Sequence, residues 1–167
     1  MERKKTVDIV TVTIIKRPAR RLMLLRSVKA SDYFSYCEEM GCDWEEILNN
    51  IPGKLDSAAI LTLPDKLVKT GTSAIAAGIE VPADYSGKLP EKYEIIELPA
   101  CEMLYFQGMP YEDKEEFIRA IEIVNKAIEE YKPEMFGYKF ACDLIPEFNF
   151  GALPEKGART MKPVKAL

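Results

Sequence analysis

Apolar and polar residues alternate over residues 7–16, VDIVTVTIIK, in a segment rich in Val, Ile and Thr. A period of two with β-branched residues is typical of a half-buried β-strand. Pro18 interrupts the pattern, because proline lacks the amide proton that a ladder hydrogen bond needs. The pattern resumes over residues 22–28, which predicts a second strand or a continuation of the first after a bend.

The spacing of apolar residues then changes to three or four, which indicates a helix. Ser31 or Asp32 offers an N-cap, and Pro52-Gly53 stops the pattern. The apolar stripe comprises Phe34, Cys37, Met40 (or Gly41), Trp44, Ile47 (or Leu48) and Ile51. We therefore predict one helix over this stretch.

The remainder of the first half predicts two strands, residues 57–63 and 73–81, joined by the turn-rich segment PDKLVKTGT. Residues 82–91, PADYSGKLPE, contain prolines and a glycine between two apolar regions. We expect this segment to link two halves of the chain.

The second half repeats the same order of elements. Residues 92–98 and 101–108 predict strands, and Asp113 offers the cap of a following helix. The apolar face of that helix consists of Phe117, Ile121, Val124, Ile128 and Tyr131. Residues 138–145 and 159–165 predict the last strands, with FGALPEKG as the loop between them.

An internal repeat relates the two halves. IIKRPARRLML begins at Ile14 and IIELPACEMLY at Ile95, with Ile, Ile, Pro and Ala at the same spacing. We predict an α+β fold of tandem strand-helix-strand-strand modules: a duplicated antiparallel sheet with pseudo-twofold symmetry and two main helices. Residues 1–167 would form a single domain of two repeats, about 7–81 and 92–165. A cleft at the join of two such modules is where small ligands usually bind.

Composition narrows the possible functions. The net charge of −4 argues against a nucleic-acid partner, and the absence of histidine removes the commonest general base and the usual zinc sites. The sequence contains no glycine-rich phosphate loop, no signal-peptide pattern and no apolar run of the ~20 residues that span a bilayer. Its cysteines form no CxxC pair. We expect a cytoplasmic protein without cofactor, metal or membrane contact.

Glu147 is the first candidate for chemistry. It lies in IPEFNF among apolar and aromatic residues, where desolvation would raise the pKa of a lone carboxyl group. A cationic ligand would offset the cost of burying that charge, and aromatic faces would add cation–π attraction. The alternative is a glutamate that points into water at the end of a strand.

Aromatic residues supply the other candidates. Trp44 is the sole tryptophan, and its counterpart in the repeat is Asn125, so the halves differ at this position. It is either a core residue or the wall of a pocket. Further candidates for ligand binding are Tyr36, Met40, Tyr105 and Tyr138, for each of which ordinary packing is the alternative.

These features together resemble the GyrI-like small-molecule-binding domain, which serves as the effector-binding domain of certain AraC- and MerR-type multidrug regulators. The resemblance rests on the duplicated halves, the PA-x-x-M/L strands, and IPEFNF followed by MKPV, and it covers about residues 7–165. It implies a pocket at the join, a glutamate on the penultimate strand (here Glu147) that meets cationic aromatic ligands, and Trp44 as a pocket aromatic. Thr160-Met161 stands where many relatives carry another acidic residue, and the sequence lacks a helix-turn-helix segment.

Three functions follow from the resemblance. The first is a stand-alone protein that captures hydrophobic, cationic aromatic compounds between the repeats. The second is a hydrolase of cyclopropane-bearing genotoxins with Glu147 as general base. The third is a protein-interaction partner similar to the gyrase inhibitor of that family. The oligomeric state is left open.

Overall fold

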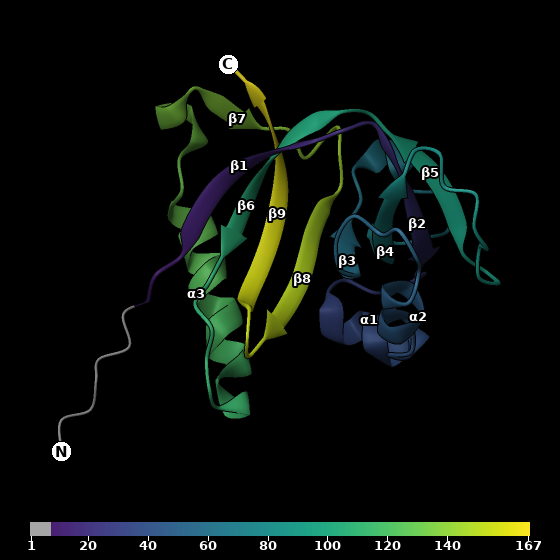
Figure 1. Ribbon diagram of the computed structural model, residues 1–167, viewed down its shortest axis with the longest axis horizontal. Coiled ribbons are helices and arrows are strands. Elements are labelled where there is room, and N and C mark those ends of the chain that lie inside the picture. The colour runs from purple at the N-terminus through teal and green to yellow at the C-terminus, as the bar shows by residue number, and fades with distance from the viewer. Residues whose placement is uncertain (1–7) are drawn as a thin grey trace.

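One antiparallel sheet organises residues 8–167, the part of the chain that the computed structural model describes (Figure 1). Its strands are β1 (Thr11–Arg17), β2 (Arg20–Arg26), β3 (Ala59–Thr62), β4 (Ile75–Pro82), β5 (Glu94–Leu98), β6 (Cys101–Gln107), β7 (Tyr138–Phe140), β8 (Glu147–Leu153) and β9 (Gly157–Ala166). The helices are α1 (Tyr33–Met40), α2 (Trp44–Asn49) and α3 (Phe117–Glu130), with 3₁₀ turns η1 (Asp65–Leu67), η2 (Lys114–Glu116) and η3 (Pro133–Phe136). The predicted α+β class is confirmed.

The order of the strands is symmetric about the contact between β8 and β3. It runs β1-β6-β9-β8-β3-β4-β2-β5, with β7 paired to β9. β1 lies beside β6 of the second repeat, and β5 lies beside β2 of the first. The chain therefore crosses from one half of the sheet to the other at Pro18-Ala19 and again at Pro99-Ala100, in the arches at the top of Figure 1. The repeated Ile-Ile-x-x-Pro-Ala sequence encodes these two crossovers.

The helices cover one face of the sheet. Cross-strand partners point to the same side, and Ile60, Asn149, Thr160 and Phe106 form one continuous row of partners. At one end of this row Ile60 packs in the core with the residues of α1 and α2, and at the other Phe106 packs with those of α3. The helix groups thus flank the centre of the sheet on the same face.

The two halves share a core on the opposite face. Leu22 and Leu61 of the first half pack in one cluster with Met103, Phe148 and Met161 of the second. All five side chains are fully buried or nearly so. Burial of such side chains contributes about 1.5–3 kcal/mol each, so this cluster holds the halves together.

The long helix predicted after Ser31 is two helices, because the chain turns sharply between them. Asp32 begins α1 with a capping box, in which its carboxylate accepts from the Ser35 amide at 2.8 Å. Gly41 ends α1 with a φ of +82°, a backbone conformation that glycine adopts more readily than residues with a side chain. Trp44 therefore begins α2 instead of continuing α1.

The end of the chain differs most from the prediction. The strand expected at 138–145 is limited to the short β7, and β8 occupies Glu147–Leu153, much of which was predicted as loop. β8 is hydrogen-bonded to β3 on one side and β9 on the other, and this pairing outweighs the turn propensity of Gly151. A bulge between Asn149 and Gly151 accommodates the glycine, whose φ is +73°.

The first predicted strand begins later than expected, at Thr11, and Val7 lies outside the described residues. The helix of the second half carries the predicted apolar face, since Phe117, Ile121 and Val124 all belong to one core cluster. None of the helices in residues 8–167 has the length and apolar character that a membrane crossing requires.

Candidate functional site

A cleft of about 320 Å³ lies between α3 and the middle of the sheet. Its floor comes from three adjacent strands and its wall from α3; the lining residues are Thr62, Glu147, Phe148, Asn149, Thr160, Lys162, Asn125, Ile128 and Glu129. Polar side chains alternate along β8 and β9, and those that share the helix side of the sheet converge here. All of its lining residues except Thr62 belong to the second repeat, so the cleft lies mainly within the second half, at its border with the first.

Glu147 begins β8 at one end of this cleft and is not a lone carboxylate. Its Oε1 lies 2.8 Å from Lys162 Nζ, and both side chains are about a quarter exposed. The Lys162 ammonium also lies 5.4 Å from the centre of the Phe140 ring. The expectation of an unpaired carboxyl group was wrong. Lys162, on the neighbouring strand, forms the ion pair with Glu147 that we expected a cationic ligand to form.

Cys142 lies close enough to Glu147 for the carboxylate charge to change the pKa of its thiol. Burial, followed by the Glu147 carboxylate, raises the pKa of the Cys142 thiol to about 11, while Lys162 acts in the opposite direction. The thiolate is the reactive form of a cysteine, and its fraction depends on the thiol pKa. The reaction rate of Cys142 therefore reports on the charges of Glu147 and Lys162.

We expect Glu147→Gln to accelerate the alkylation of Cys142 by iodoacetamide at pH 8.5, since loss of the negative charge lowers the thiol pKa. Lys162→Met should slow the same reaction, since it removes the cation that favours the thiolate. Mass spectrometry of each cysteine over time measures both rates, with the exposed Cys42 as internal reference. Equal Cys142 rates in all three proteins would contradict this electrostatic coupling.

An aromatic hollow of about 50 Å³ lies beside the cleft. It is lined by Tyr33, Trp44, Glu45, Ala58, Phe117, Asn149, Phe150, Gly151, Ala152 and Leu153. Trp44 is 2% exposed and makes edge contact with Tyr33 at a centroid distance of 6.2 Å. Its indole Nε1 is buried and has no hydrogen-bond partner within residues 8–167.

Asn149 lines both the cleft and the hollow, and its side chain lies where the two meet. Its Oδ1 accepts a 2.9 Å hydrogen bond from the Gly151 amide within the bulge. Glu147 and Trp44 therefore line separate spaces that share one residue. A ligand that spans both must contact or displace Asn149.

The other predicted ligand-binding residues lie elsewhere. Tyr36 is fully buried, and its hydroxyl donates to the Leu25 carbonyl at 2.9 Å, so it is a core residue. Met40 packs partly buried against the same core. Tyr105 is on the face of the sheet opposite the helices, and Tyr138, on β7, packs against the core beneath α3. None of these four lines the cleft or the hollow.

Sequence reasoning missed Lys162, Asn149 and Thr62 because their positions depend on strand register. Lys162 faces Glu147 only because β8 pairs with β9. The resemblance placed Glu147 on the penultimate strand, but the local pattern predicted residues 150–153 of that strand as loop. The signal that was available is the alternation in RTMKPV, which places Thr160 and Lys162 on one side of a strand.

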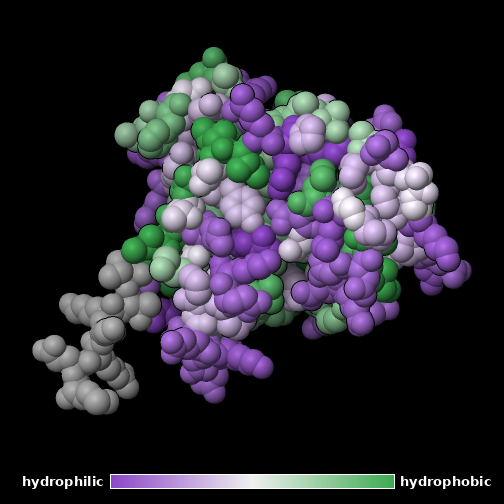
Figure 2. Space-filling view, in the orientation of Figure 1, coloured by the Kyte–Doolittle hydropathy of each residue, from purple (hydrophilic) through white to green (hydrophobic). Residues whose placement is uncertain are grey.

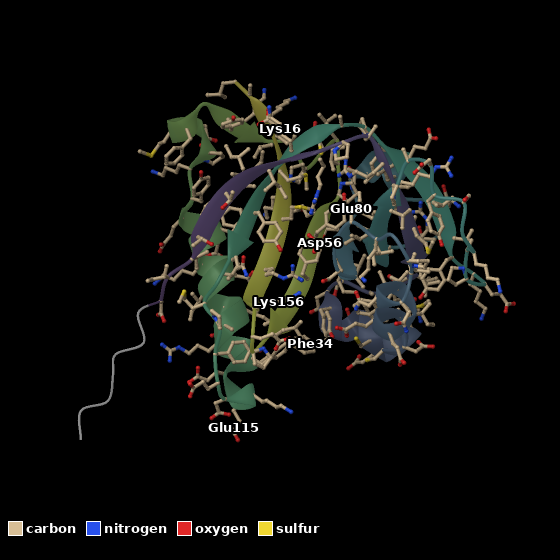
Figure 3. All side chains as sticks on the ribbon, in the orientation of Figure 1. Lys16, Phe34, Asp56, Glu80, Glu115 and Lys156 are labelled. Carbon is tan, nitrogen blue, oxygen red and sulfur yellow. The ribbon has the colours of Figure 1, made fainter. Side chains whose placement is uncertain are left out.

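A charged cluster lies on the opposite face, where the halves meet. Arg20 Nε donates to Glu80, and both side chains are almost completely buried. Arg17 bonds Asp56 at 2.8 Å and lies 3.6 Å from Glu80, and Arg159 bonds Asp56 at 3.3 Å. Figure 3 shows Asp56 and Glu80 near each other at the middle of the molecule. Members of both repeats take part, so the cluster joins the halves.

Tyr105 extends this charged cluster. Arg159 donates to its hydroxyl at 2.6 Å, and burial raises the pKa of Tyr105. The Tyr105 ring stacks on Phe150 at 6.1 Å. Tyr105 therefore belongs to the junction between the halves and not to the cleft.

No family model matches the sequence, and no curated protein is similar to it at the level of sequence. Solved structures do share its architecture. The crystal structure of the EcmrR C-terminal domain has a TM-score of 0.52 and 16% identity, covering 95% of this chain and 99% of that one. SAV2435 bound to tetraphenylphosphonium has a TM-score of 0.55 and 15% identity, covering 93% and 94%.

The likeness is one of fold. It is consistent with the GyrI-like arrangement that the sequence resembles. The chain also matches EcmrR in an EcmrR–DNA complex, with a TM-score of 0.50 and 14% identity. That match covers 95% of this chain but only 58% of the EcmrR chain. Within residues 8–167, no three His, Cys, Asp or Glu side chains lie together in a way that could hold a metal ion.

Proposed function

We propose that this protein binds hydrophobic organic cations in the cleft between α3 and the sheet, with Glu147 as the counter-charge and the aromatic hollow as the second subsite. The observation that carries the proposal is the Glu147 carboxylate, about a quarter exposed, at one end of this cleft. The similar fold of SAV2435, which was solved with tetraphenylphosphonium, supports the same class of ligand.

Lys162 has a defined role in this proposal. In the absence of a ligand its ammonium neutralises Glu147 and lies over the Phe140 ring. A bound cation would take over both interactions, and Lys162, which is on the rim and a quarter exposed, would swing into water. The lysine is thus a competitor that lowers the apparent affinity for cations.

Asn149 limits the size of the ligand. The cleft of about 320 Å³ is at the lower end of the range for ligand pockets, and the hollow beside it is smaller. Rotation of the Asn149 side chain would join the two spaces at the cost of one hydrogen bond to Gly151. A bulky aromatic cation would then contact Trp44.

We expect Glu147→Gln to weaken the binding of tetraphenylphosphonium about tenfold, which is roughly 1.4 kcal/mol. Lys162→Met should strengthen it by a similar factor, because Glu147 then has no internal partner to lose. Titration followed by the fluorescence of Trp44, the sole tryptophan, measures both dissociation constants.

Glu130→Gln is the matched control, since this glutamate is exposed on α3 and does not line the cleft. It should bind as the unmodified protein does. Affinity that is unchanged by both Glu147→Gln and Lys162→Met would refute the proposal, as would the absence of any fluorescence response across a panel of aromatic cations.

Binding is proposed in preference to hydrolysis because SAV2435, which shares the fold, was solved with a bound organic cation. No contact in the structure favours a protein-inhibitor role. The four cysteines are free thiols, which fits a reducing cytoplasm.

A further inference from the structure

A second and larger groove lies beneath the two crossovers, away from the cleft. Its volume is about 560 Å³, well within the range that holds small ligands. It is bounded by the end of β1, the start of β6, the segment between β7 and β8, and the end of β9. Lys16, labelled at the top of Figure 3, marks its position.

The walls of this groove are apolar. They consist of Pro99, Ala100, Cys101, Ala141, Leu144, Ile145, Pro163, Val164 and Ala166. Leu144 is 39% exposed, so its side chain is accessible to a molecule in the groove. Figure 2 shows hydrophobic residues gathered at the upper end of this face with hydrophilic side chains at their border. The groove therefore suits an apolar body.

The rim of the groove is positively charged, although the chain as a whole carries a net charge of −4. Lys16, Lys66 and Lys165 are exposed there, and Glu102 is the sole acidic residue in the lining. None of the three lysines forms an ion pair with any residue of 8–167, whereas Lys69 and Lys162 do. Their charges are available to a ligand.

The charged cluster behind the groove adds to this field. It contains three guanidinium groups (Arg17, Arg20 and Arg159) but two carboxylates (Asp56 and Glu80), so one positive charge is in excess. Arg17 itself lines the groove. Arg20 lies directly behind the wall, donating to the Pro99 carbonyl at 2.8 Å and contacting Cys101 Sγ at 3.5 Å.

The donors of these arginines are not all used. Arg20 Nη2 is buried and lacks a hydrogen-bond partner among the described residues, whereas Arg17 Nε lies 3.6 Å from Glu80 Oε1. A buried excess charge is costly, and an anion held near it offsets that cost. An apolar wall, free lysines and an unbalanced cationic cluster thus point to the same kind of ligand.

We infer that this groove binds a small amphipathic anion, a molecule with one negative head group on an apolar body. The head group meets Lys16, Lys165 and Arg17, and the body lies on Leu144, Ile145 and Val164. The site is separate from the cation cleft and has the opposite charge preference, so the protein carries two ligand sites of complementary chemistry.

The test uses two dyes that differ only by a sulfonate: 1-anilinonaphthalene-8-sulfonate and its uncharged parent, N-phenyl-1-naphthylamine. The anionic dye should bind with 1:1 stoichiometry and at least about fivefold more tightly than the neutral dye. Lys16→Gln and Lys165→Gln should each weaken the anionic dye by about fivefold, the upper range for an exposed ion pair, and leave the neutral dye unchanged. Leu144→Glu should abolish binding of the anionic dye.

Lys156→Gln is the control, because Lys156 is an exposed lysine that does not line the groove and lies well away from Lys16 in Figure 3. Equal binding of the two dyes, or equal losses in Lys16→Gln and Lys156→Gln, would overturn the inference. Glu147→Gln should leave dye binding unchanged, so a failure of the cation cleft and a failure of the anion groove give different results.

Discussion

Replacement of Glu80 by glutamine should lower the free energy of unfolding by about 3–5 kcal/mol, the range for breaking a buried ion pair from one side. Glu80 is 1% exposed and is the partner of the fully buried Arg20. The substitution leaves that guanidinium buried without its counter-ion and weakens the contact with Arg17 as well. Urea denaturation followed by circular dichroism at pH 7 measures the loss.

Glu94→Gln is the matched comparison. Glu94 also pairs with an arginine, Arg26 at 2.6 Å, but it is 29% exposed, so water compensates for much of the lost interaction. We expect its effect to be below about 1 kcal/mol. If the two substitutions cost the same, the charged cluster does not stabilise the junction in the way its burial indicates.

Phe148→Ala should have an effect of similar size, about 3–5 kcal/mol, because it leaves a cavity in the core that the halves share. Phe148 is 1% exposed and stacks with Phe150 at a centroid distance of 6.0 Å. It lies on β8, and its cross-strand neighbours are Leu61 on β3 and Met161 on β9.

Phe34→Ala gives the reference change in the free energy of unfolding for a phenylalanine outside the core, since this side chain is 55% exposed. Its effect should lie within about 0.5 kcal/mol of zero. A loss below about 1 kcal/mol for Phe148→Ala would mean that the halves are joined by backbone pairing alone and not by the shared core.

Elements with a strong local pattern were predictable from the sequence. The β-branched alternation before Pro18 and the amphipathic face of α3 gave strands and a helix at nearly the right places. Local signals also carry information about the ends of elements, as the capping box at Asp32 shows. The symmetric order of the strands follows the duplication read from the spacing of Ile14 and Ile95.

Features that depend on pairing between distant strands could not be predicted. β8 contains Gly151 and ends beside Pro154, so its local composition favours a turn, and its neighbours β3 and β9 decide its structure. The ion pair of Glu147 with Lys162 depends on the pairing of β8 with β9, and that of Arg20 with Glu80 on the pairing of β2 with β4. Glu147 was identified from its surroundings in the sequence, but its partner was not.

The placement of Tyr36 shows a related limit. Tyr36 was not part of the predicted apolar stripe, and a tyrosine beside it fits a pocket wall or a core equally well. The hydrogen bond to Leu25 that settles its role joins two different elements. Periodicity did not identify the buried face of α1 correctly, because Phe34 of the predicted stripe is 55% exposed and Tyr36 is fully buried. It does not reveal which buried residues border an open space.

The exchange of β1 and β5 has a consequence for the origin of such a protein. A single repeat would have its first strand directed away from its own sheet, with nothing of its own to pair with. In a dimer of an ancestral half-length chain, the first strand of each copy would therefore have paired with the sheet of the other copy, as in a domain-swapped homodimer. Joining the copies through the segment after β4 would make that partnership permanent and free each copy to diverge.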